Sequence, residues 1–108
     1  MQLKNFQFYK SEKVPAQMEQ KINEHLKDNS FRFAIQNESA STRKVVLSLF
    51  CEPASEQVKA TVKAKVFRSV STDDAEKQVN QFFKDGAKMK FATQSFVENN
   101  ITTIVFYE

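Results

Sequence analysis

The sequence predicts an α+β fold of two tandem β-α-β-β units, which form one continuous, mainly antiparallel sheet with two helices on one face. Three observations lead to this prediction. A segment of the chain recurs, strict alternation of apolar and polar residues marks strands, and apolar residues four apart mark helices. The two predicted repeats are residues 3–52 and 61–108, and residues 1–108 are predicted to form a single domain.

The repeat is clearest in the helical segments, MEQKINEHLKDN at 18–29 and AEKQVNQFFKDG at 75–86. Four residues recur there, with Glu19, Asn23, Lys27 and Asp28 matched by Glu76, Asn80, Lys84 and Asp85. Strand-like segments align in the same order: FQFYKS (6–11) with AKVFRS (64–69), FRFAIQ (31–36) with MKFATQ (89–94), and VVLSLFCE (45–52) with ITTIVFYE (101–108). The shared order of these patterns favours an internal duplication.

Each unit is predicted to begin with a strand and continue into a helix. The first strands are residues 4–10 and 57–68, and the second alternates apolar and polar residues from Val58 to Val66. The first helix has Pro15 in its first turn and is expected to end at Asn29. In the second helix Ser71 is the expected cap, with Asp74 three residues later, and Gly86 is the expected end. The apolar stripes of the two helices are Met18, Ile22 and Leu26, and Ala75, Val79 and Phe83.

Two further strands complete each unit. Residues 31–37 and 44–52 flank the polar stretch NESASTR, and residues 88–95 and 100–107 flank VENN, as expected of hairpins. Pro53 and the following ASE are predicted to turn strand 44–52 into strand 57–68, which joins the two units in one sheet.

One face of this sheet is expected to pack against the helices. The residues predicted to point toward the helices are Phe6, Phe8, Phe31, Phe33, Ile35, Leu47 and Leu49, with Ala64, Val66, Met89, Phe91, Thr93, Thr103 and Val105. The opposite face is the candidate interaction face, and its residues are Tyr9, Arg32, Phe50, Lys63, Lys65, Phe67, Lys90 and Phe106.

The candidate face mixes aromatic rings with cations, which leaves three interpretations open. An exposed apolar face indicates a protein interface. The partner is expected to be a second copy of the chain, which gives a homo-oligomer, or another protein. Stacking rings beside cations also suit single-stranded nucleic acid. The string Phe31-Arg32-Phe33-Ala34 lacks the glycine of the aromatic motif found in RNA-recognition domains. The leading hypothesis is a small, non-enzymatic interaction or regulatory protein that assembles through its open sheet face or an edge strand. The alternative is a module that binds single-stranded nucleic acid on the same basic and aromatic face.

Enzymatic chemistry is not predicted. His25 and Cys51 are the obvious candidates for catalysis, but the repeat places Phe82 and Tyr107 at their positions, which indicates packing. One His and one Cys do not make a zinc site at the spacings present, and the sequence has no P-loop or glycine-rich dinucleotide turn. No catalytic residue, metal or cofactor is therefore expected.

Composition suggests a cytoplasmic protein without a membrane segment. No apolar run approaches the roughly 20 residues that a membrane helix needs, and the first residues, MQLKNFQFYK, lack the apolar core of a signal peptide. A lone cysteine fits a reducing compartment. The net charge of +3 is weak evidence for an acidic partner.

The second unit resembles a family of short sporulation-associated proteins of unassigned function. The features that carry the resemblance are the opening strand Val62–Phe67, the acidic helix start Asp73–Asp74, the helix end Phe83–Asp85 and the final strand Val105–Glu108. The resemblance covers about 45 residues well and the first unit less well. It implies a small, intracellular, non-enzymatic protein with one such unit per chain. The family supplies no catalytic residues, and the duplication here departs from its pattern.

Overall fold

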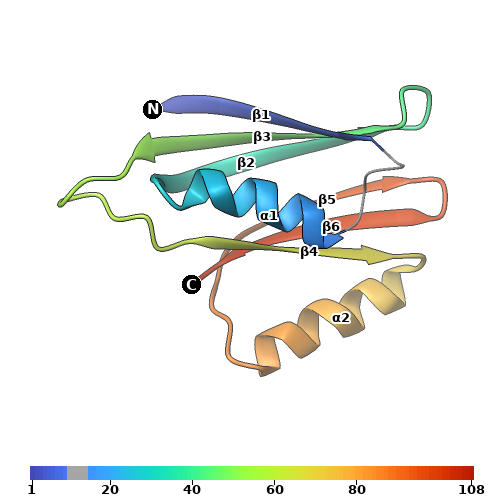
Figure 1. The fold of residues 1–108 in the computed structure, drawn as a ribbon. Coiled ribbons are helices and arrows are strands. Elements are labelled where there is room, and N and C mark those ends of the chain that lie inside the picture. The colour runs from blue at the N-terminus through green and yellow to red at the C-terminus, as the bar shows by residue number, and fades with distance from the viewer. Residues whose placement is uncertain (10–14) are drawn as a thin grey trace.

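The computed structural model describes residues 1–9 and 15–108. Lys10, predicted as the end of the first strand, lies outside the described residues. The described elements are shown in Figure 1. In chain order they are β1 (Gln2–Tyr9), α1 (Pro15–Leu26), β2 (Asn29–Ser39), β3 (Lys44–Pro53), β4 (Lys63–Ser69), α2 (Thr72–Lys84), β5 (Met89–Val97) and β6 (Asn100–Tyr107).

The strands form two separate sheets, so the predicted single continuous sheet is wrong. The N-terminal sheet has the order β1-β3-β2 and the C-terminal sheet the order β4-β6-β5, with every neighbouring pair antiparallel. The last strand of each half lies in the middle of its sheet, so both of its edges are already occupied. β3 therefore has no free edge to offer β4, whatever turn follows Pro53.

Both halves share the β-α-β-β order that the sequence predicts, and their sheets share one strand order. The outer strands of each sheet run parallel to each other, because both are antiparallel to the strand between them. The helix in each half is the crossover between those two outer strands.

Local signals in the sequence set the ends of both helices. Pro15 begins α1, and the backbone N–H of Asp74 donates to the Ser71 hydroxyl at 3.1 Å, as expected of an N-cap. Gly86 follows α2 with a φ of 109°, a conformation that glycine adopts without strain. α1 ends earlier than predicted, at Leu26. Asn29 begins β2 instead, and its Nδ2 donates to the His25 carbonyl at 2.8 Å.

The two helices lie in different layers rather than on one face. Figure 1 shows α1 between the N-terminal sheet and β4, and α2 on the far side of the C-terminal sheet. The sheets themselves meet along β2 and β5. The resulting core takes residues from both halves: Phe8, Met18, Ile22, Leu26, Ala34, Leu47, Leu49, Cys51, Ala64, Val66, Ile104 and Phe106. This shared core makes the two halves one packed unit.

A β-bulge in β2 reverses part of the predicted face pattern. The pairing of β2 with β3 shifts between Phe31 and Phe33. Phe31 packs against the core, whereas Phe33 and Ile35 lie on the opposite face with 38% and 48% of their surface exposed. The predicted burial of Phe33 beneath a helix is therefore wrong. The same shift occurs between Met89 and Phe91 in β5. Phe91 is partly buried, but against the shared core rather than beneath α2.

The strand registers show which residues of the two halves are equivalent. On the central strands, Cys51 faces Gln2 and Phe31, while Tyr107 faces Lys63 and Met89. Gln2 is thus equivalent to Lys63, and counting along each strand makes Phe6 equivalent to Phe67. Ring contacts agree, because Phe6 meets His25 edge-on at 5.9 Å and Phe67 meets Phe82 edge-on at 5.5 Å.

This register corrects the sequence alignment of the first strands, which matched Phe6 with Ala64. A shift by an odd number of residues turns every side chain to the other face of a strand. Ala64 and Val66 consequently point away from α2, the helix of their own half, and pack in the core with α1.

Candidate functional site: the outer sheet face

The N-terminal sheet has one covered face and one open face. Side chains on the covered face pack against α1 and the C-terminal sheet. The open face carries large apolar residues from all three strands, and we call it the outer sheet face. Its defining residues are Leu3 (53% exposed), Tyr9 (45%), Phe33 (38%), Ile35 (48%) and the half-buried Phe50.

The apolar residues of this face form an ordered patch. The rings of Phe33 and Phe50 stack with their centroids 4.4 Å apart and their planes 8° from parallel. Leu3 lies opposite Phe50 on the neighbouring strand. Lys44 places its Nζ 5.1 Å from the Tyr9 ring centroid, a cation–π contact at one end of the patch. Leu3, Phe50 and Phe33 therefore form an apolar cluster across the three strands, and exposed apolar clusters often mark interaction surfaces.

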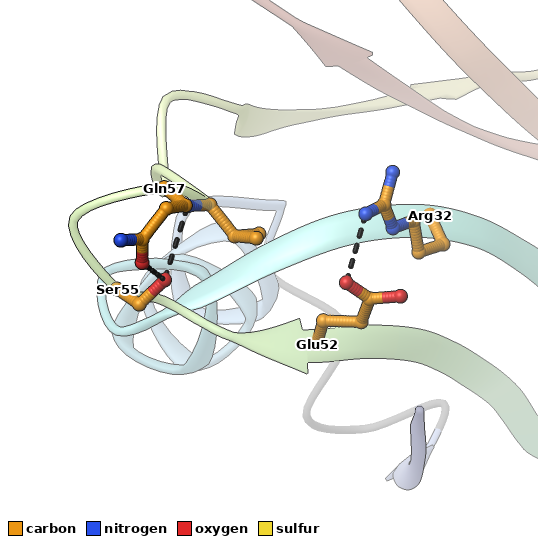
Figure 2. A network of polar contacts seen from close by, with 5 residues as sticks. Arg32, Glu52, Ser55 and Gln57 are labelled. Carbon is orange, nitrogen blue, oxygen red and sulfur yellow. Dashed lines mark hydrogen bonds and ion pairs between the residues drawn. The ribbon is translucent and has the colours of Figure 1, made fainter.

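Of the residues predicted for the interaction face, the structure places Tyr9 and Phe50 here. Arg32 lies beside them on β2 within the bulge. Its guanidinium donates to Glu52 at 2.8 Å, and Figure 2 shows the two side chains pointing toward each other from adjacent strands. This hydrogen bond and the opposite charge lower the pKa of Glu52 and raise that of Arg32. Figure 2 also shows Ser55 and Gln57 in the loop after β3, where the Ser55 hydroxyl donates to Gln57 Oε1 at 3.5 Å.

The predicted aromatic residues of the second half lie elsewhere. Phe106 is fully buried in the core, and Phe67 is 8% exposed, with its ring against Phe82 of α2. Their predicted exposure on one open face is therefore wrong. The physical reason is that strands β4 and β6 are covered on both faces, by α2 on one and by α1 with the N-terminal sheet on the other.

The predicted cations of the second half are also spread out. Lys65 lies 3.4 Å from the Glu19 carboxylate, and Lys90 lies 3.7 Å from the carboxylate of Glu108. Lys63 is exposed at the start of β4. The structure thus does not bring Lys63, Lys65 and Lys90 onto the outer sheet face.

The covered side shows how the two halves contact each other. β4 is an edge strand, and α1 satisfies three of its outward backbone groups. Asn23 Oδ1 accepts from the Ala64 N–H at 2.7 Å, and Asn23 Nδ2 donates to the Ala64 carbonyl at 3.1 Å. Glu19 Oε1 accepts from the Val66 N–H at 2.8 Å. Side chains of a helix therefore cover a sheet edge that could otherwise pair with another strand.

A polar cluster joins the sheets where β2 meets β5. The Gln36 amide donates to the Ser95 hydroxyl at 2.7 Å and to the Thr102 carbonyl at 3.0 Å, and it accepts from the Thr93 hydroxyl at 2.7 Å. The Ser95 hydroxyl in turn donates to Glu38 at 2.8 Å. Strict alternation from Phe31 would put Gln36 on the opposite face, and the bulge turns it toward the C-terminal sheet.

The reactive side chains are located in packed positions. Cys51 is 1% exposed, and burial raises the pKa of its thiol, which disfavours the thiolate. Burial and the nearby charge of Lys4 lower the pKa of His25. Within residues 1–9 and 15–108, no group of three or more His, Cys, Asp or Glu side chains is arranged to hold a metal ion. Neither described helix has the length and apolar character required to cross a membrane.

Sequence reasoning missed Leu3, Phe33 and Ile35 as residues of the candidate surface. The alternation of Phe33 and Ile35 with polar neighbours was visible in the sequence. Their face was misassigned because a bulge leaves no sign in a pattern of period two.

Comparison with protein-family models, with curated proteins and with solved structures finds no match for this chain. The resemblance to sporulation-associated proteins stays a prediction.

Proposed function

We propose that this chain is a non-enzymatic interaction module that self-associates through its outer sheet face. The observation that carries the proposal is the exposed apolar group of Leu3, Tyr9, Phe33, Ile35 and Phe50, which lies on the face of the N-terminal sheet opposite the core. Each Å² of apolar surface in water costs about 25 cal/mol, so covering the patch with protein is favourable. The buried thiol of Cys51 supports an interaction role over nucleophilic catalysis.

The charges near the patch favour a protein surface over nucleic acid as its ligand. A platform for single strands needs cations that are available to phosphates. Arg32 is paired with Glu52, and Lys65 and Lys90 lie beside carboxylates on other parts of the molecule. Phe67 and Phe106 are buried, so they offer no ring for stacking.

Sedimentation velocity over a concentration series tests the proposal. We expect the parent to associate as its concentration rises and the double variant Phe33→Ser, Ile35→Ser to stay monomeric. Val70→Ser is the matched control, because Val70 is 72% exposed and lies outside the patch. Association of the double variant equal to that of the parent would show that the face is not the interface. Anisotropy of a labelled oligothymidylate at low salt is expected to show no binding, and tight binding would favour the nucleic-acid alternative.

A further inference from the structure

The contact between the two halves of the chain has two sides. A surface equivalent to each side is also present elsewhere in the described part of the molecule, where it has no partner. Within one chain, α1 and β2 of the first half pack on the sheet of the second half. The equivalent elements of the second half are α2 and β5, and the corresponding side chains on them, Glu76, Asn80, Met89 and Ala92, are exposed. The equivalent sheet surface of the first half is the outer sheet face, which is also open. Each molecule therefore presents both partners of a contact that it already makes once.

The helix side of this contact recurs on α2. Glu19 and Asn23 of α1 bind the free edge of β4. Their equivalents Glu76 and Asn80 have the same chemistry and the same four-residue spacing, and both are exposed. No charge or amide is needed at these positions for α2 to pack on its own sheet, because α2 uses Ala75 and Phe82 for that purpose.

The strand side recurs on β5. On β2, Ala34 is 4% exposed and Phe31 packs on Phe91 and Phe106 of the C-terminal sheet. The equivalents on β5 are Ala92, which is exposed, and Met89, which is 55% exposed. Phe96 follows on the same side of β5 with 64% of its surface exposed. We call Glu76, Asn80, Met89, Ala92 and Phe96 the α2–β5 surface.

The receiving surface recurs on the N-terminal sheet. The register makes Leu3 and Asn5 of β1 equivalent to Ala64 and Val66, whose backbone groups Asn23 and Glu19 bind. β1 is an edge strand, as β4 is. Along a strand, side chains and backbone groups alternate together, so a residue's face determines the edge to which its N–H and carbonyl point. Leu3 and Asn5 therefore point their backbone groups away from β3, as Ala64 and Val66 point theirs away from β6. Phe50 and Phe33 of the outer sheet face take the places of Phe106 and Phe91.

Charge complementarity supports the same pairing. Lys65 lies 3.4 Å from Glu19 across the internal contact. The register makes Lys4 the equivalent of Lys65, and the repeat makes Glu76 the equivalent of Glu19. Both Lys4 and Glu76 are exposed. A second copy docked in the internal geometry would bring these opposite charges together.

We propose that copies of this chain associate head to tail, with the α2–β5 surface of one copy on the outer sheet face of the next. This inference rests on the proposed function and specifies its partner surface. Because the two surfaces differ, the contact is heterologous, and repeated addition gives a ring or a filament rather than a closed dimer. Each added copy would extend the order of layers found within one chain, which is sheet, helix, sheet and helix.

Two variants and their mixture test the proposal by sedimentation velocity. The outer-face variant is Phe33→Ser with Ile35→Ser, and the α2–β5 variant is Glu76→Lys with Met89→Ser. Circular dichroism and urea midpoints under monomeric conditions check that both fold, and Val70→Ser is the control with neither surface changed. We expect the parent to form species larger than a dimer and each variant to associate about tenfold or more weakly. An equimolar mixture should stop at a 1:1 dimer, because each variant keeps one intact surface.

Zero-length carbodiimide coupling gives a second measurement that requires no substitution. In an equal mixture of isotope-labelled and unlabelled parent, mass spectrometry should find Lys4 of one copy coupled to Glu76 of another. Absence of that peptide from a covalently trapped oligomer would contradict the geometry.

The outcomes separate this inference from the proposed function. If the outer-face variant is monomeric while the α2–β5 variant associates as the parent does, the outer face pairs with itself. The head-to-tail contact is then overturned and the proposed function stands. If the parent remains monomeric at high concentration, or if the outer-face variant associates normally, both proposals fail.

Discussion

The ring of Phe31 in β2 stacks on the ring of Phe106 in β6, with centroids 4.4 Å apart and planes 13° from parallel. The two residues belong to different halves of the chain and to different sheets. Their contact therefore lies at the interface where the two halves pack together.

Replacing Phe106 with Ala should lower the free energy of unfolding by about 3–5 kcal/mol, because the side chain is fully buried and its removal leaves a cavity. Phe33→Ala is the control, since Phe33 is 38% exposed and should cost clearly less. Urea denaturation under monomeric conditions measures both. Equal losses for the two variants would contradict the assignment of Phe106 to the core and Phe33 to the surface.

Asn23→Ala should lower the free energy of unfolding by about 1–3 kcal/mol, because it leaves the edge N–H and carbonyl of Ala64 without their partners. Asn80 is the matched control at the equivalent place on α2. Asn80→Ala should change the stability of the monomer by less than about 0.5 kcal/mol, because Asn80 is exposed. Similar losses for both variants would show that capping of the β4 edge is not what stabilises the contact.

His25 should make stability depend on pH below neutrality. The fold lowers the pKa of His25 from 6.5, so the folded protein binds this proton more weakly than the unfolded chain. The stabilisation is therefore present above pH 6.5 and is lost as the pH falls through the lower pKa of the folded state.

Urea midpoints measured between pH 7.5 and 5.5 report this loss of stability, because that range of about two pH units spans the ordinary histidine pKa. His25→Phe introduces the residue type that Phe82 supplies at the equivalent position, and it should flatten the dependence. Since the chain has one histidine, an unchanged slope in the variant would assign the effect to other groups.

Cys51 should react with a thiol reagent only after the fold opens. Its side chain is 1% exposed, and burial raises the pKa of the thiol. Labelling by 5,5′-dithiobis(2-nitrobenzoate) should be roughly a hundredfold or more slower in the native protein than in urea, because it requires opening of the core. Rapid labelling of native protein would place the thiol at an accessible surface.

The order of elements, the start of each helix and the residue that closes α2 could be predicted from the sequence because they depend on local chemistry. Ser71 caps α2 through a neighbour three residues away, Gly86 closes it, and Met18, Ile22 and Leu26 share a face through the helical period alone. The same local patterns recur in both halves, so both halves show the same order.

The layering and the candidate surface were decided only by tertiary structure. Alternation predicts that a strand has two different faces, but it does not say which face meets which layer. The bulge beside Arg32 turns Phe33 and Ile35 outward, and the register of β4 turns Ala64 and Val66 toward α1. Both choices rest on contacts between residues far apart in the chain, which a local pattern does not contain.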